Sequence, residues 1–322
     1  MKILLWHVHG SWTTAFVQGS HEYVVPVLPD RGPDGVGRAR TWDWPASVIE
    51  CAPADLPHHD FDVVVLQRPN EVELVRDWLG RAAGTDIPAI YLEHNAPDER
   101  PCTQRHPMAD RRDIPIAHVT HFNELFWDNG SAPTTVIEHG IVDPGPRYTG
   151  EIASGAVVVN EPGRRGRIVG ADLVPRFAQV GSVEIFGMQS SRFAASLGGP
   201  VTAHEDLATQ DDMHTELGRR RVYLHPMRWT SLGLSLIEAM QLAMPVIVVA
   251  ATEALEAVPR GAGLLSTDIH RLIDAFQLYL NEPQAAAEAG LRARAAALER
   301  YGLKRFLRDW DELLDSVLVT AG

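Results

Sequence analysis

Short apolar runs alternate with longer amphipathic stretches along the first half of the chain. Continuous apolar runs are typical of parallel strands, because helices cover both faces of a parallel sheet. The runs that predict strands here are Ile3–Trp6, Tyr23–Leu28, Asp62–Leu66, Pro88–Leu92, Ile116–Thr120 and Thr135–Glu138. Helix candidates between them include Glu71–Arg81 and Phe122–Asn129. Strands that alternate with helices in this way indicate βαβ units.

The pattern stops between His139 and Ser154, where glycine and proline are dense, and then begins again. We interpret this segment as a linker between two domains. The apolar runs that follow predict strands at Ala156–Val159, Val183–Phe186, Val222–Leu224 and Val246–Ala250. Helices dominate the end of the chain, with an alanine-rich helix at Gln284–Leu298 and apolar residues at helical spacing from Leu303 to Val317.

These patterns predict an α/β protein with two Rossmann-like domains. The chain has 322 residues, which suits two domains of ordinary size. We place the first domain at residues 1–145, the second at 146–302 and a C-terminal helix at 303–322. Ligands of open parallel sheets bind outside the carboxyl ends of the strands, so we expect both sets of strand ends to face one cleft.

Composition and charge exclude several classes of function. The chain is 45% apolar and 22% charged, which is enough to bury a core. Its net charge of −13 argues against broad binding to nucleic acid or to anionic membranes. No apolar run approaches the roughly 20 residues of a membrane helix, so we expect no integral membrane segment. The two cysteines, Cys51 and Cys102, favour a reducing compartment, and we expect a cytoplasmic protein.

The segment from Val222 to Met240 is the most informative part of the sequence. It is read as a strand, a loop with Gly233 and a helix, and the free N–H groups at a helix start favour a bound phosphate. Glu238 lies about one turn inside that helix. It could accept hydrogen bonds from the ribose hydroxyls of a nucleotide, or Ser235 and Glu238 could form a capping box, and the spacing leaves both interpretations open.

Three further loops follow predicted strands. The first carries Arg164, Arg165 and Arg167, which form either an anion site or a solvated charge cluster. In the second, His94 could contact a sugar or a reacting oxygen, or serve as a routine hydrogen-bonding residue of a turn. In the third, Gly10 could permit the close approach of a ligand, or form a simple turn. The histidines of the first half show no convincing metal-ligand spacing.

The segment Val222–Ala250 resembles the nucleotide-sugar site of the retaining glycosyltransferases of the GT-B fold, the family-4-like group also known as glycosyltransferase group 1. The matching residues are Tyr223–Pro226, Leu232-Gly233-Leu234, Glu238-Ala239-Met240 and Met244-Pro245-Val246. Ile137–Asp143 is similar to the interdomain segment of that family. Tyr301–Trp310 is similar to the helix that crosses back to the first domain.

The resemblance implies a role for each candidate residue. Glu238 would bind the ribose, and His94 would lie near the donor sugar and the departing oxygen. Thr230 stands eight residues before Glu238, where the family has a glutamate that contacts the sugar, and it can form a hydrogen bond but brings no charge. The remaining nucleotide-sugar-binding residues would be Gly10, Arg164, Arg167, Leu232, Gly233 and Leu234.

The expected function is therefore the transfer of a sugar from a nucleotide-diphosphate sugar to an unknown acceptor. The nucleotide of the donor is expected to be UDP or GDP. The resemblance implies retention of configuration and a reaction without metal or other cofactor. Thr230 also motivates an alternative, a non-catalytic nucleotide-sugar-binding partner of another transferase. An epimerase on the same fold would show additional acidic residues, and the sequence presents no clear set of them.

Overall fold

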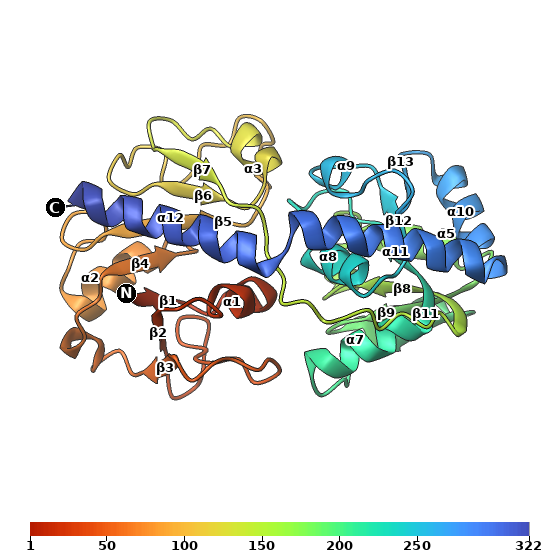
Figure 1. The fold of residues 1–322 in the computed structure, drawn as a ribbon, viewed down its shortest axis with the longest axis horizontal. Coiled ribbons are helices and arrows are strands. Elements are labelled where there is room, and N and C mark those ends of the chain that lie inside the picture. Colours follow the sequence, from red (N-terminus) through yellow and green to blue (C-terminus); the bar gives the residue numbers. More distant parts are fainter. Residues whose placement is uncertain (322) are drawn as a thin grey trace. The chain divides into compact units, whose positions relative to one another are not determined.

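The computed structural model describes residues 1–321 and the side chains of residues 1–319. The chain divides into two compact units (Figure 1). Unit 1 contains Met1–Val142 and the C-terminal segment that begins at Leu303, and unit 2 contains Asp143–Gly302. Each unit is built on one sheet, which confirms the predicted α/β class with two Rossmann-like sheets.

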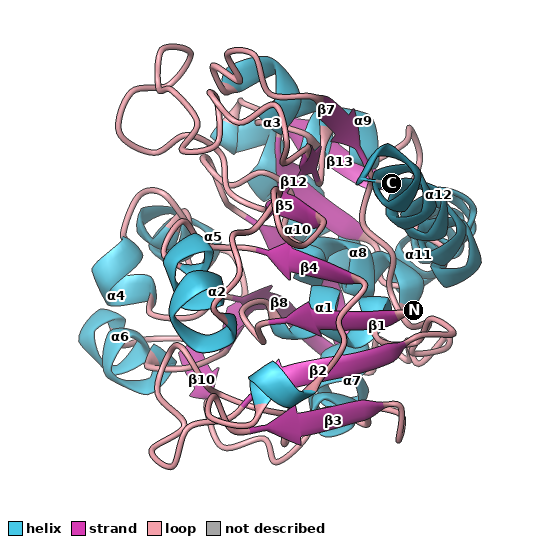
Figure 2. Cartoon of the chain, turned by 90° about the vertical axis from the view of Figure 1, so that its left-hand side faces the viewer, coloured by secondary structure: helices cyan, strands magenta, loops and turns pink. Residues whose placement is uncertain are grey.

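The sheet of unit 1 has the strand order β3-β2-β1-β4-β5-β6-β7, and its named strands pair in parallel. Figure 2 shows β1 to β4 side by side with their arrows pointing the same way. The strands are β1 (Lys2–Leu5), β2 (Glu22–Pro26), β3 (Val48–Cys51), β4 (Val63–Leu66), β5 (Ala89–Glu93), β6 (Ile116–His118) and β7 (Thr134–Val136). The helices are α1 (Gly10–Phe16), η1 (Leu56–His58), α2 (Glu71–Leu79), α3 (His121–Phe126) and α12 (Leu303–Ala321).

The sheet of unit 2 has the order β10-β9-β8-β11-β12-β13 and is also parallel. Its strands are β8 (Ile152–Val158), β9 (Ser182–Phe186), β10 (Val201–His204), β11 (Arg220–His225), β12 (Val246–Val249) and β13 (Gly263–Ser266). Its helices are α4 (Pro162–Arg165), η2 (Ala171–Leu173), α5 (Val174–Phe177), α6 (Ser190–Leu197), α7 (Gln210–Arg219), α8 (Leu234–Gln241), α9 (Ala254–Ala257), α10 (Ile269–Asn281) and α11 (Pro283–Arg300).

Every strand predicted from an apolar run is present, and the three strands that were not predicted share one property. β3, β10 and β13 each lie at the edge of a sheet. An edge strand is covered less completely than a central one, so its sequence can hold exposed or polar residues and loses the continuous apolar signal. β3, for example, exposes both of its central residues.

Two boundaries differ from the predictions for local reasons. The predicted linker His139–Ser154 is too long at its end, because Ile152 already begins β8. The helix predicted at Phe122–Asn129 ends at Phe126, where Trp127 adopts an extended backbone. The start of α3 is well defined, since the Thr120 side chain accepts a hydrogen bond from the backbone N–H of Asn123.

The C-terminal helix α12 belongs to unit 1, as the predicted crossing back to the first domain requires. Its buried side chains include Phe306, Trp310 and Leu314. The Trp310 ring packs edge-on against Trp12 and Phe16, with centroids 5.5 and 5.0 Å away. Such aromatic contacts anchor a helix through a large buried apolar area.

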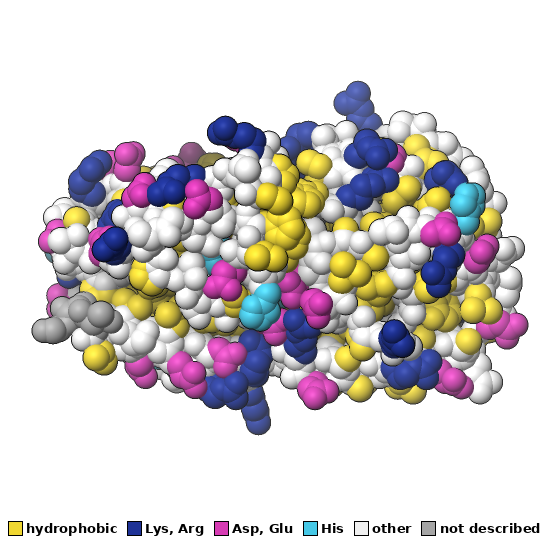
Figure 3. Space-filling model, turned by 90° about the horizontal axis from the view of Figure 1, so that it is seen from above, with side chains coloured by type: hydrophobic (Ala, Val, Ile, Leu, Met, Phe, Trp, Pro, Cys, Tyr) yellow, Lys and Arg dark blue, Asp and Glu magenta, His cyan; other side chains and the backbone are white. Residues whose placement is uncertain are grey.

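Charged side chains of both signs are interspersed on the face of the molecule drawn in Figure 3. Among the residues that the structure describes, no helix combines the length and the apolar character needed to cross a membrane.

Candidate functional site

In unit 2, two loops at the carboxyl edge of the sheet are locked together. One follows β8 and the other follows the neighbouring strand β11. The backbone N–H of Arg228 donates to the carbonyl of Ile168 over 2.9 Å. Gly170 has a φ of +71°, and a Cβ added there would stand 2.0 Å from the carbonyl oxygen of Pro226, so only glycine allows this approach. The arginine loop and the loop that leads into α8 therefore form one surface.

The start of α8 has the predicted order of strand, glycine and helix. Gly233 is its N-cap, and no side chain caps this end of the helix. The first N–H groups of a helix have no partner within it, so they are available to a ligand anion. A Cβ on Gly233 would lie 2.5 Å from the His225 ring, so this glycine also permits tight packing inside the unit. Leu232 and Leu234 flank it at the same end of the helix.

Glu238 lies one turn into α8 and is 3% exposed. Its Oε2 accepts a hydrogen bond from Gln210 Nε2 over 3.1 Å and lies 3.3 Å from His214 Nε2. The alternative of a capping box at Ser235 and Glu238 is wrong, because the N-cap is Gly233 and the Ser235 hydroxyl instead accepts from Tyr223 over 2.9 Å. The carboxylate is held by another helix.

That helix is α7, whose Gln210 and His214 were not recognised in the sequence. The two residues are four apart and therefore share one face of the helix, and their side-chain nitrogens lie 3.1 Å apart. Thr209 and Asp212 form a capping box that fixes where α7 begins. The spacing of four residues could be seen in the sequence. Which helix the pair contacts depends on tertiary packing and could not be predicted from that spacing.

Two of the three arginines in the loop after β8 form ion pairs, and the third does not. Arg164 pairs with Glu161, with Nε 3.0 Å from Oε1, and Arg167 pairs with Asp172 over 2.8 Å. Arg165 is half-buried, and burial, together with the nearby charge of Arg164, lowers its pKa. Among the described residues, no ion pair links Arg165 to a carboxylate. Of the three arginines, it is therefore the one whose charge is least neutralised by an ion pair.

A cavity of about 700 Å³ opens beside this loop, at the carboxyl ends of β8, β9 and β10. Its lining includes Arg164, Phe193 and Glu205. It also includes Glu161 and Gln189, whose φ values of 54° and 58° are in the left-handed region although neither is glycine. Such backbone strain is concentrated at functional sites. Thr230, by contrast, is half-exposed in the loop before α8 and does not line this cavity.

In unit 1, the predicted residue His94 lies in a cluster of buried histidines. It directly follows β5, and its ring centroid lies 3.8 Å from that of His9 and 6.2 Å from that of His139. Burial and the neighbouring imidazoles lower the pKa of His94 well below its usual value. Burial is also the main cause that lowers the pKa of His9 to about 4 and that of His139 to about 3. The three rings are therefore neutral at pH 7.

Gln67 defines which nitrogen of His94 carries the proton. The Gln67 side-chain nitrogen donates to the carbonyl of Trp6 over 2.6 Å, so its oxygen faces His94 Nε2, 3.2 Å away. A neutral imidazole has one donor and one acceptor, and here Nε2 is the donor. Nδ1 of His94 is then the acceptor that could hold a hydroxyl group.

Gly10, the remaining predicted residue, begins α1. A Cβ on Gly10 would stand 3.1 Å from the indole nitrogen of Trp42 and 3.9 Å from His7 Nε2. The structure thus brings Gly10 against a tryptophan of its own unit. Its predicted contact with the nucleotide sugar stays a prediction.

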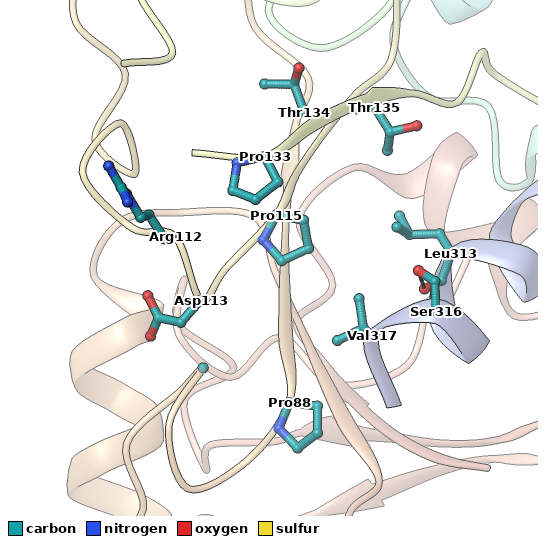
Figure 4. A pocket seen from close by; sticks show the side chains of 11 residues that line it. Pro88, Arg112, Asp113, Pro115, Pro133, Thr134, Thr135, Leu313, Ser316 and Val317 are labelled. Carbon is teal, nitrogen blue, oxygen red and sulfur yellow. Dashed lines mark hydrogen bonds between the residues drawn. The ribbon is translucent and has the colours of Figure 1, made fainter. Parts of the chain in front are cut away.

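A second cavity in unit 1, of about 420 Å³, lies away from these residues. Pro88, Pro115 and Pro133 line it and directly precede β5, β6 and β7, so it is at the opposite edge of the sheet from His94. Figure 4 shows Leu313 and Val317 of α12 beside these prolines. Among the described residues, no group of three or more histidine, cysteine or acidic side chains is arranged to hold a metal ion.

A family model of known proteins matches part of the chain. Residues 170–282 match the family model described as glycosyl transferases group 1. This range contains α7, α8 and Glu238. Among curated protein sequences, none matches the chain.

Solved structures share the fold at low sequence identity. Anabaena HepE in complex with UDP-glucose is 14% identical with a TM-score of 0.71, and the match covers 98% of this chain and 100% of that one. Sucrose-phosphate synthase from Thermosynechococcus elongatus is 14% identical with a TM-score of 0.71 and coverage of 99% and 100%. S. aureus TarM is 14% identical with a TM-score of 0.63, and the match covers 78% of this chain and 54% of TarM.

Proposed function

Because the chain is a glycosyltransferase with the GT-B fold and a group 1 domain, we propose that it transfers a sugar from a UDP-sugar to an acceptor hydroxyl. The proposal includes retention of the anomeric configuration and a reaction that needs no metal ion or other cofactor. Unit 2 holds the donor nucleotide, and unit 1 holds the acceptor.

The buried carboxylate of Glu238 is the observation that carries this proposal. A charge that is 3% exposed is costly unless hydrogen bonds satisfy it. Gln210 and His214 supply such contacts to Oε2. The carboxylate stays one turn from the uncapped start of α8, a spacing that suits a nucleotide whose ribose meets Glu238 and whose diphosphate meets the helix end.

The cationic and dipolar groups of the same edge suit the departing diphosphate. In the proposed step, the acceptor oxygen bonds to the anomeric carbon and the bond from that carbon to the phosphate oxygen breaks. The hydroxyl proton passes to the departing phosphate oxygen. The start of α8 and the guanidinium of Arg165 stabilise the negative charge that develops there, with Arg164 and Arg167 close in sequence.

We assign His94 and Thr230 to the sugar itself. The neutral His94 accepts a hydrogen bond from a sugar hydroxyl through Nδ1, in the orientation that Gln67 defines. Thr230 supports a donor-sugar hydroxyl through an uncharged contact. The choice of UDP draws support from similar structures, because HepE was solved with UDP and with UDP-glucose, and TarM with UDP.

A nucleotide panel and a turnover assay test this function together. Thermal unfolding is measured with UDP, GDP, ADP and TDP, since a ligand that binds only the folded state stabilises it by about 2.7 kcal/mol at a hundredfold excess over its Kd. We expect UDP to give the largest shift. UDP release from UDP-glucose and UDP-N-acetylglucosamine is then followed with and without a chelator, and we expect no loss of turnover on chelation.

The outcomes separate the parts of the proposal. UDP binding without consumption of any donor would indicate a nucleotide-sugar-binding protein in place of a transferase. Turnover that stops with chelator and returns with Mg²⁺ would contradict the metal-free reaction. A shift with GDP alone would replace the uridine donor by a guanosine donor.

A further inference from the structure

Two tryptophans in the loop between β2 and β3 have different environments. Trp44 is 4% exposed, and its indole N–H donates to the Thr14 hydroxyl over 2.8 Å. Trp42 is half-exposed, and among the described residues no hydrogen bond or ring contact involves it. The loop therefore uses one tryptophan as an anchor and leaves the other partly exposed, with its indole edge beside Gly10.

The loop that carries Trp42 is held in place by several contacts within unit 1. The guanidinium of Arg38 donates to the carbonyls of Pro45, Trp44 and Val48. The carbonyl of Gly37 lies 3.0 Å from Nδ1 of His7, on the loop after β1. The backbone on both sides of Trp42 is thus held without a ligand, and a loop that is already ordered loses little conformational entropy on binding.

Trp42 lies next to the histidine cluster. Its Nε1 approaches to 3.1 Å from the Cβ position of Gly10, so a larger residue at position 10 would displace the indole. Gly10 directly follows His9, whose ring lies 3.8 Å from that of His94. The loops after β1, β2 and β5 therefore bring a partly exposed indole and the proposed sugar-binding histidine to one edge of the sheet.

We infer that Trp42 is a stacking platform for a sugar ring of the acceptor, so that the acceptor is a carbohydrate or a glycoside. This inference rests on the proposed function. A pyranose ring presents C–H groups on a face, which pack on the electron-rich face of an indole, and hydroxyls around its rim. Polar groups occur close to Trp42: His7 Nε2 and the Trp42 N–H both lie within 4 Å of the Cβ position of Gly10, and Arg40 and Asp43 are exposed neighbours in sequence.

A flat aromatic acceptor would favour a different environment. Apolar ligands are usually enclosed in pockets that bury most of their surface. Trp42 lies in neither of the two cavities described above, and its neighbours in sequence are exposed polar residues. A partly exposed indole with exposed polar neighbours fits a ring that keeps many of its hydroxyls in water.

Saturation-transfer NMR with simple glycosides tests the platform. The probes are methyl α-D-glucoside, methyl α-D-mannoside, methyl β-D-galactoside and N-acetylglucosamine at millimolar concentration, with 4-methylumbelliferone as an aromatic probe, each with UDP present. We expect at least one glycoside to show saturation of ring C–H protons on one face. The Trp42→Ala variant should lose about tenfold in affinity for it, and Trp42→Phe should lose less.

Trp78→Ala is the matched control, because Trp78 is another half-exposed tryptophan of unit 1 and lies near the end of α2. We expect this variant to bind the glycoside like the wild type. Equal glycoside binding by wild type and Trp42→Ala, binding of the aromatic probe alone, or no glycoside binding at all would each overturn the inference. A missing UDP shift in the wild type would instead contradict the proposed function, which keeps the two failures distinct.

Discussion

The candidate functional residues at the carboxyl edges of the two sheets differ in their charge. In unit 2 this edge is charged, with Glu238 on α8 and the arginine loop after β8. In unit 1 the rings next to His94 are neutral imidazoles, those of His9 and His139. The buried carboxylates of this edge, Glu71 and Glu93, each contact a basic side chain of the same unit. The family model matches only within unit 2. We interpret the charged residues of unit 2 as the part that recognises a nucleotide diphosphate. We interpret the histidine cluster of unit 1 and Trp42 as the part that binds the acceptor.

We expect the free energy of unfolding to decrease at acid pH because of the buried histidines of unit 1. Burial lowers the pKa of His9 to about 4 and those of His118 and His139 to about 3, against 6.5 in the unfolded chain. Between pH 6.5 and about 4 the unfolded chain binds more protons than the folded one, so stability falls as pH falls. The upper limit is about 1.4 kcal/mol per pH unit for each histidine.

Urea unfolding at pH 7, 6 and 5 measures this dependence. His118→Asn removes one buried imidazole, and its stability should fall less steeply with pH than that of the wild type. His58→Asn, at an exposed histidine of the same unit, should keep the wild-type slope. A wild-type free energy of unfolding that stays constant from pH 7 to 5 would contradict the lowered pKa values of these histidines.

The second effect in size concerns turnover in unit 1. His94→Ala removes the proposed acceptor of a sugar hydroxyl, and we expect kcat to fall about a hundredfold. UDP affinity should be unchanged, because the nucleotide is assigned to unit 2. Steady-state kinetics and calorimetry with UDP measure the two quantities. The control is His118→Asn, a buried histidine paired with Asn129, and a comparable loss of kcat there would remove the special role of His94.

The third effect concerns how unit 2 holds Glu238. His214→Phe removes the imidazole that lies 3.3 Å from the carboxylate, and we expect UDP affinity to fall about fivefold, close to 1 kcal/mol. His214→Gln can still donate a hydrogen bond and should recover part of that loss. Calorimetry with UDP measures both variants. Equal affinity in wild type and His214→Phe would mean that His214 is not needed to position Glu238.

The central strands of both sheets could be predicted from the sequence, whereas three of the four edge strands could not. Runs such as Val63–Leu66 are buried on both faces and give a continuous apolar signal. β3, β10 and β13 lie at sheet edges and lack that signal. The C-terminal helix was also predictable, because its buried positions repeat at helical spacing.

The candidate site shows the same limit at the level of single residues. The place of Glu238 on α8 could be predicted from the strand–glycine–helix order. Its partner His214 could not, since helix α7 lies in a separate stretch of sequence and only tertiary packing brings the two together. Spacing also does not distinguish a buried Trp44 from a partly exposed Trp42, because both lie in one irregular loop.

Titration calorimetry of UDP against wild type and Glu238→Gln tests the central claim most directly. The amide keeps the shape of the side chain but removes the charge that would accept the ribose hydroxyls, so the account predicts about tenfold weaker binding, close to 1.4 kcal/mol. Glu184→Gln, another carboxylate of unit 2 that contacts a histidine and Arg220, should bind UDP like the wild type. Equal affinity in wild type and Glu238→Gln would contradict the account.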